Sequence, residues 1–210
     1  MSLLAELSFL LCVLCFYGIC RDRRRYLKNR VGRDAFRNAY RVARNMFFML
    51  RRNDLELTGD AGVLKGGCVL YSFHFGVWEL MPYTLRNRGF QIGVIVNRYQ
   101  RDNVSVLARL VDSALKRWRA VNGVRVFYGE NVLEIVRFIK SGGIFGMLVD
   151  GNTLFQKYAK ARKLAQLCKV PLVPFAAYRS GNSGVLNIGC DLPGLVQTMP
   201  LEYMWFYKSR

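Results

Sequence analysis

The chain contains a single histidine, and the residues around it have the types that acyl transfer to an alcohol requires. His74 follows the apolar run 68–73, and Glu79 lies five positions further on. An alcohol is a poor nucleophile until a base removes its proton, and an imidazole exchanges protons near neutral pH. A carboxylate on the other ring nitrogen fixes the tautomer and stabilises the imidazolium. If the chain turns at Gly76, Glu79 can approach the ring, so His74 and Glu79 are the predicted catalytic pair.

The sequence offers no obvious nucleophile for a covalent enzyme intermediate, because no Ser or Cys lies in a G-x-S-x-G turn. Direct attack of an acceptor hydroxyl on a thioester is therefore the favoured reaction. Cysteines and carboxylates are not placed around the one histidine at zinc-ligand spacing, which predicts no metal and no cofactor. A lone histidine beside an apolar strand also has a purely structural interpretation, and the residues alone leave both open.

Short apolar runs alternate with helical periodicity from Leu64 onward. The strands are expected at 67–73, 90–97, 124–128, 144–149, 171–178 and 185–189, and the helices at 78–87, 104–120, 131–140 and 154–168. This alternation predicts an α/β fold with a mixed, mostly parallel central sheet flanked by helices. Ligands of such sheets bind beyond the carboxyl ends of the strands. The residues that follow the expected strands there are His74, Arg98, Gly129 and Asp150.

The N-terminal segment has the pattern of a membrane anchor. Residues 1–20 contain no Lys or Arg, residues 3–19 are almost continuously apolar, and a basic block follows at 21–25. About 17 apolar residues is the lower limit for a helix that crosses a bilayer. Because positive charge stays on the cytoplasmic side, the rest of the chain is expected in the cytoplasm. A helix that lies in the membrane interface or packs on the domain is the alternative.

A second amphipathic helix is expected over residues 33–50. Its apolar stripe comprises Phe36, Tyr40, Ala43, Phe47 and Leu50, beside a stripe of Arg33, Arg37, Arg41 and Arg44. Such a helix either rests on anionic headgroups or packs on the domain with its arginines in water. The expected organisation is a membrane anchor at 1–20, a basic amphipathic helical region at 21–63 and an α/β domain at 64–210.

The formal net charge is +18, from 32 Lys and Arg against 14 Asp and Glu. Such a surplus implies an anionic partner, which is a nucleic acid, a membrane surface or an acidic carrier protein. The apolar run followed by a basic block favours a membrane. Nucleic-acid binding is the least favoured of the three, because no recognised binding motif is present.

Six segments resemble, in the same order, the sequence blocks of the lipid A late acyltransferases. These are the lauroyl and myristoyl transferases of the lysophospholipid acyltransferase superfamily. The segment 72–79, Ser-Phe-His-Phe-Gly-Val-Trp-Glu, is similar to their H-x-x-x-x-E block. The other five segments are 93–98 with Asn103 beyond, 116–119, 139–150, 164–175 and 200–205.

The resemblance implies a glycerolipid-acyltransferase-like fold in which His74 and Glu79 form the catalytic dyad. Arg98 and Arg117 would bind the anionic acceptor or hold the reacting carbonyl, with Arg119 as a further substrate-binding residue, and Asp150 would order the site. For the arginines a solvated basic face is the alternative, and for Asp150 a turn.

The resemblance also implies the two substrates and the location. The donor would be the acyl thioester of acyl carrier protein, which is acidic. The acceptor would be a hydroxyl of a lipid A precursor or related anionic glycolipid. The enzyme would sit in a bacterial inner membrane with its catalytic domain facing the cytoplasm.

The chain departs from that family in three places. The stretch after Asp150 and the segment 191–200 are short, and the family's terminal W-x-H-R-R block lacks its histidine at 205–210. Two alternatives follow. One is an acyltransferase for another lipid such as a lysophospholipid, although those enzymes usually have Asp where this chain has Glu79. The other is a non-catalytic membrane-bound module that binds lipid or carrier protein.

Overall fold

The computed structural model describes residues 33–50, 54–96, 117, 119, 123–151 and 153–204. Seven strands form one sheet in the order β1-β7-β6-β2-β5-β3-β4. Among the described strands, only β6 and β7 pair antiparallel, which confirms the expected mixed, mostly parallel sheet. The strands are β1 (Glu56–Gly59), β2 (Cys68–Ser72), β3 (Ile92–Val96), β4 (Arg125–Tyr128), β5 (Ile144–Leu148), β6 (Leu172–Ser180) and β7 (Ser183–Ile188).

The helix expected at 104–120 lies outside the described residues, apart from Arg117 and Arg119. The described helices include four at or close to their expected ranges. They are α3 (Arg33–Leu50), α4 (Leu80–Asn87), α6 (Val132–Lys140), α7 (Tyr158–Cys168) and α8 (Leu192–Thr198), with 3-10 turns η1 (Ala61–Leu64) and η3 (Pro200–Glu202). Helix α7 begins later than expected because residues 154–157 form turns. Helix α8 was not expected, although Asp191 caps it by accepting from the backbone N–H of Gly194 at 3.2 Å.

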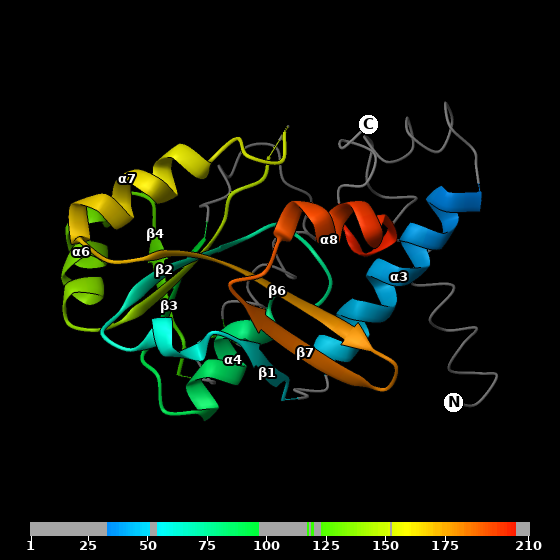
Figure 1. Ribbon diagram of the computed structural model, residues 1–210, viewed down its shortest axis with the longest axis horizontal. Coiled ribbons are helices and arrows are strands. Elements are labelled where there is room, and N and C mark those ends of the chain that lie inside the picture. Colours follow the sequence, from blue (N-terminus) through cyan, green and yellow to red (C-terminus); the bar gives the residue numbers. More distant parts are fainter. Residues whose placement is uncertain are drawn as a thin grey trace.

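The helices cover both faces of the sheet (Figure 1). Along β2, Cys68 and Leu70 pack in the core cluster that includes α4, whereas Val69 packs in the cluster that includes α6, α7 and α8. Alternate residues of a strand point to opposite faces, so a central strand covered on both sides is apolar at nearly every position. This is why the apolar run before His74 predicts a buried strand.

The sheet begins before the expected domain start at residue 64. Strand β1 pairs with β7 at the sheet edge, and Leu55, which precedes it, is buried in the core. The expected anchor at 1–20 lies outside the described residues. Within the described part of the chain, no helix has the length and apolar character needed to cross a bilayer.

Helix α3 has the expected bounds. Of its expected apolar stripe, Tyr40 and Ala43 are half-buried, and the side chains of Phe36, Phe47 and Leu50 lie outside those described. The buried side chains are Asn38, Val42, Asn45, Phe48 and Met49. Two asparagines lie on the inner face because η3 supplies their hydrogen-bond partners. Side chains of the expected arginine stripe are exposed at Arg37, Arg41 and Arg44.

Candidate active site

The pairing of β2 with β5 brings His74 and Asp150 together. The two strands are parallel, with Ser72 opposite Leu148 at their carboxyl ends. His74 and Asp150 each follow two residues later. The imidazole Nδ1 lies 2.8 Å from Oδ1 of Asp150, and the backbone N–H of His74 donates to Oδ2 at 3.1 Å. This is the end of the sheet at which a ligand site was expected.

Asp150 is fully buried, and three donors surround its carboxylate. The third donor is the hydroxyl of Tyr203, which is 3.1 Å from Oδ2. An ionised carboxylate only accepts hydrogen bonds, so this network places the imidazole proton on Nδ1 and leaves a lone pair on Nε2. The side chain of His74 is 25% exposed, while that of Asp150 is 0% exposed. The buried carboxylate of Asp150 thus fixes the orientation of the partly exposed imidazole of His74.

Glu79 lies in a different interaction from the one expected. Its two carboxylate oxygens accept hydrogen bonds from Arg119, with the guanidinium Nε 3.0 Å from Oε2. The two side chains are 16% and 10% exposed, so this bidentate pair is largely removed from water. The predicted pairing of Glu79 with Nδ1 of His74 is therefore corrected, because Asp150 holds that ring nitrogen.

The turn after His74 depends on glycine at position 76. Gly76 has φ of +59°, and a Cβ there would lie 2.2 Å from the carbonyl oxygen of Ala177. The N–H of Gly76 donates to the carbonyl of Glu202 at 2.9 Å, and the N–H of Met204 donates to the carbonyl of His74 at 2.7 Å. Residues 202–204 thus hold the backbone of the loop as well as Asp150. The chain turns where the sequence predicted, and the fixed loop directs the ring to Asp150.

Trp78 lies against the imidazole in an edge-to-face arrangement, with ring centroids 5.2 Å apart. Its indole Nε1 is buried, and so is Oγ of Ser72 at the end of β2. Within the described residues, neither atom has a hydrogen-bond partner.

The predicted arginines have different surroundings. Arg98 lies outside the described residues, Arg117 is exposed, and Arg119 is buried against Glu79. The described residues bring together no group of three or more His, Cys, Asp and Glu able to hold a metal ion. Of the predicted set, the structure unites His74 with Asp150 and Glu79 with Arg119.

The sequence did not identify Tyr203 as part of the site. Tyr203 is 53 residues from Asp150 along the chain, and its only signal was its position in the last segment of the resemblance. Asn38 was also missed. Its amide donates to the carbonyls of Leu201 and Tyr203 at 2.9 Å each, which ties α3 to the residues that hold Asp150.

Comparisons with known proteins were made for the whole chain. No protein-family model matches it, and no curated protein sequence matches it either.

Proposed function

We propose that the chain is an acyltransferase in which His74 acts as general base and Asp150 orients it. Nε2 accepts the proton of an acceptor hydroxyl as its oxygen attacks the carbonyl carbon of an acyl thioester. The new C–O bond forms, the C–S bond breaks, and the imidazolium returns the proton to the leaving thiolate. The observation that carries the proposal is the Nδ1 to Oδ1 contact of 2.8 Å between a partly exposed ring and a fully buried carboxylate.

The described cysteines support direct transfer over a covalent thioester on the enzyme. Burial raises the pKa of Cys68 to about 12 and that of Cys190 to about 11, and burial also raises the pKa of Cys168. A thiol reacts as its thiolate, so these groups are weak nucleophiles at neutral pH. In the proposed reaction, proton transfer by His74 and positioning of the two substrates carry the catalysis.

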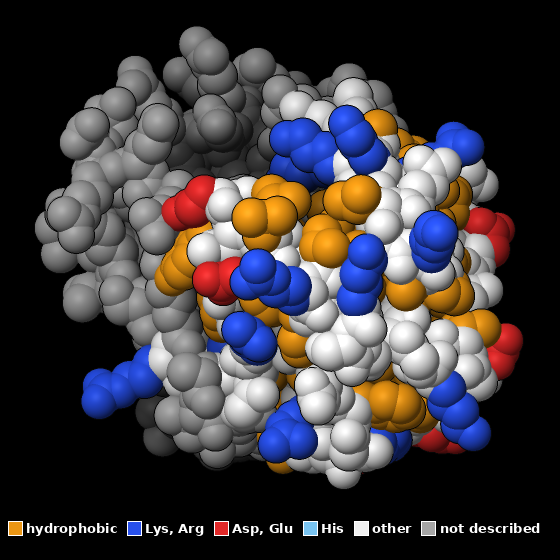
Figure 2. Space-filling view, turned by 90° about the vertical axis from the view of Figure 1, so that its left-hand side faces the viewer, with side chains coloured by type: hydrophobic (Ala, Val, Ile, Leu, Met, Phe, Trp, Pro, Cys, Tyr) orange, Lys and Arg blue, Asp and Glu red, His pale blue; other side chains and the backbone are white. Residues whose placement is uncertain are grey.

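The proposed donor is the thioester of acyl carrier protein. Figure 2 shows an end of the molecule where many Lys and Arg side chains surround smaller hydrophobic areas. Helices α6 and α7 supply exposed basic residues, namely Arg137, Lys140, Lys160, Arg162 and Lys163. Leu133 and Leu167 are exposed among them. An acidic carrier is attracted to such a surface by charge complementarity, while exposed leucines add apolar contact area.

The proposed acceptor is a hydroxyl of an anionic glycolipid, of the kind that lipid A precursors provide. In this proposal Arg98 and Arg117 bind its charged groups. Glu79 fixes the guanidinium of Arg119 beside the site, so Glu79 acts as a positioning residue. Attachment through residues 1–20 would hold the domain at the cytoplasmic face of a bacterial inner membrane, within reach of such a lipid.

Turnover by the full chain, purified in a non-ionic detergent, tests the proposal. The substrates are acyl carrier protein with a radiolabelled acyl chain and, in separate reactions, a lipid A precursor and a lysophospholipid. We expect label in the glycolipid, and we expect His74→Ala to reduce the rate at least about 100-fold, the size of a general-base contribution.

Each other outcome has a defined meaning. Label in the lysophospholipid alone would keep the reaction and change the acceptor. Full activity in a folded His74→Ala protein would refute the proposed base. Binding of both substrates by the intact protein without turnover would identify a non-catalytic binding module.

A further inference from the structure

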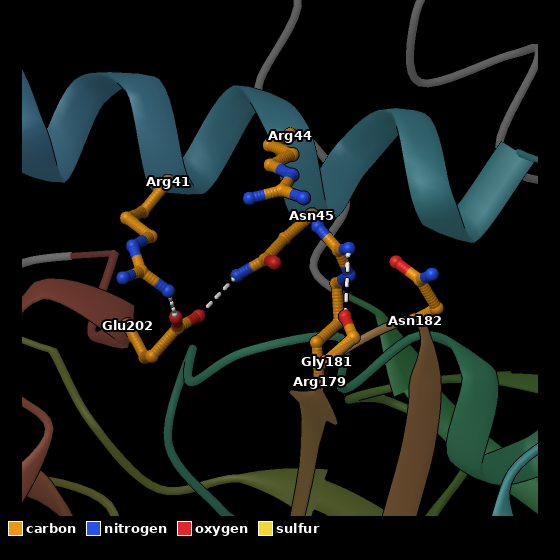
Figure 3. Close-up of a pocket in the computed structure, with 7 residues that line it drawn as sticks. All are labelled: Arg41, Arg44, Asn45, Arg179, Gly181, Asn182 and Glu202. Atoms are coloured by element: carbon orange, nitrogen blue, oxygen red, sulfur yellow. Dashed lines mark hydrogen bonds and ion pairs between the residues drawn. The ribbon is translucent and has the colours of Figure 1, made fainter. Parts of the chain in front are cut away.

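A second candidate site lies between α3 and the hairpin of β6 and β7. A cavity of about 210 Å³ opens there, many times the volume of one water molecule. Figure 3 shows Arg41, Arg44 and Asn45 pointing from α3 towards Arg179 and Glu202. We call this cavity the arginine pocket, and its lining residues are Arg41, Arg44, Asn45, Arg179, Gly181, Asn182 and Glu202.

The arginine pocket contains more positive than negative charge. Three guanidinium groups line it, and Glu202 is the one carboxylate among its lining residues. Glu202 is already engaged, because it accepts from Arg41 at 3.0 Å and from the amide of Asn45 at 2.6 Å. Within the described part of the chain, no carboxylate forms an ion pair with Arg44 or Arg179. Glu202 is thus the one acidic side chain that lines the cavity beside Arg44 and Arg179, and the lining keeps a net positive charge.

The surroundings of Arg179 reflect this surplus of positive charge. Burial lowers the pKa of its guanidinium, and the positive charge of Arg44 lowers that pKa further. Its Nε is buried without a hydrogen-bond partner in the described residues, although another nitrogen donates to the carbonyl of Gly181 at 3.1 Å. The guanidinium also lies over the ring of Phe48 at 5.0 Å, which holds it in place. A fixed guanidinium with free donors and surplus charge is suited to bind an oxyanion.

We infer that the arginine pocket binds a phosphate group, with Arg44 and Arg179 as its principal ligands. Phosphate offers several acceptor oxygens to guanidinium donors, and the cavity has room for a tetrahedral group. None of the residues predicted to bind substrate belongs to this pocket. The inference does not depend on acyl transfer, because it requires only the charge and shape of the cavity.

The pocket lies close to the candidate active site along the backbone. Glu202 lines the pocket, and its carbonyl accepts from Gly76 in the loop of His74. The next residue, Tyr203, donates to Asp150. A phosphate that competes with Glu202 for Arg41 would therefore act on the turn that holds both the loop and the buried acid.

Thermal unfolding of the full chain in inorganic phosphate tests the inference. At constant ionic strength, set with sodium chloride, the midpoint should rise with phosphate and saturate, because a ligand of the folded state stabilises it. Arg44→Gln and Arg179→Gln should each weaken the apparent phosphate affinity at least about fivefold, the loss of one charge-assisted contact. Since Arg44 is exposed, Arg44→Gln keeps the fold even if Arg179→Gln does not.

Arg162→Gln is the matched control, because it removes one exposed positive charge from α7, outside the pocket. His74→Ala is the second control, since it removes the proposed base and leaves the pocket intact. Both should retain the wild-type phosphate affinity. The inference is overturned if phosphate has no saturable effect, or if Arg162→Gln weakens it as much as Arg44→Gln. Loss of turnover alone does not affect it.

Vesicles identify the source of the phosphate group. Phosphatidylcholine vesicles are compared with vesicles that also contain phosphatidic acid, a phosphate monoester, in co-sedimentation. Preferential binding to phosphatidic acid that Arg44→Gln reduces and Arg162→Gln does not assigns the pocket to a lipid headgroup. Saturable stabilisation by inorganic phosphate with equal vesicle binding by both variants assigns it to a soluble phosphate.

Discussion

The loop of His74 and the arginine pocket meet at η3, yet their charges are arranged in opposite ways. At the loop, one buried carboxylate accepts from the backbone and ring of His74 and from Tyr203, and the ring itself remains partly exposed. In the pocket, three guanidinium groups lie around one carboxylate that pairs with Arg41, and the buried Nε of Arg179 has no hydrogen-bond partner among the described residues.

The difference shows at which site the protein itself supplies partners for the charged groups. A carboxylate with three donors is fully satisfied by the protein and can hold an imidazole in one orientation before any substrate arrives. A cluster of like charges is stabilised further when an anion enters, because the anion offsets their mutual repulsion. The first site is thus suited to proton transfer, and the second to binding.

The largest expected effect comes from Asp150→Asn. The amide preserves the shape, but it removes the charge that stabilises an imidazolium and offers N–H groups where three donors point. We expect the rate of acyl transfer to fall about 10³- to 10⁴-fold, as when the acid behind a catalytic imidazole is replaced by its amide. Steady-state kinetics of the purified variant check this. A rate within tenfold of wild type would show that Asp150 does not orient the base.

Glu79→Gln separates the two candidate carboxylates. It leaves Arg119 without its partner in a largely buried position, so we expect the free energy of unfolding to fall by about 3 kcal/mol. Turnover of the folded protein should fall less than in Asp150→Asn. Denaturant unfolding and kinetics are measured on both variants. If Glu79→Gln abolished turnover at unchanged stability, the dyad predicted from the sequence would be correct instead.

Tyr203→Phe removes one of the three donors to Asp150 and leaves the aromatic ring. We expect a loss of about 1–2 kcal/mol in the free energy of unfolding, because a buried acceptor loses a hydrogen bond. Tyr178→Phe is the control, since the ring of Tyr178 packs against Phe75 much as that of Tyr203 packs against Phe73, but the Tyr178 hydroxyl is not part of the Asp150 network. Equal stability losses in the two variants would argue against a special role for the Tyr203 hydroxyl.

Glu202→Gln tests the role of the one carboxylate that lines the arginine pocket. Its side chain is 8% exposed, but that of Arg41 is 51% exposed, so water screens the pair and we expect a loss of about 1 kcal/mol. Removing the negative charge should tighten inorganic phosphate binding about threefold to tenfold, because Arg41 becomes free and the net charge rises. The phosphate titration described above measures this. Weaker binding would mean that Glu202 helps to hold the ligand.

Much of the fold was predictable because strands buried on both faces are continuously apolar. The range 67–73 and β2 (Cys68–Ser72) agree closely, and so do 144–149 and β5 (Ile144–Leu148). The short edge strand β1 (Glu56–Gly59) was missed, because four residues without a fully buried position give little periodic signal. Helix α3 had the expected bounds, but the burial of its two asparagines was not predicted, since their hydrogen-bond partners lie 157 to 165 residues away.

The sequence by itself predicted the kinds of element and the end of the sheet at which His74 and Asp150 lie. Local patterns suffice for these, because apolar periodicity and residue type act over a few positions. Only the tertiary structure decided which carboxylate holds the imidazole. Glu79 is nearer to His74 in sequence, but the register of β2 against β5 places Asp150 at the imidazole. The carboxylate of Glu79 instead accepts hydrogen bonds from Arg119. The arginine pocket likewise exists only once α3 lies against the β6–β7 hairpin, because packing between distant segments sets which charges meet.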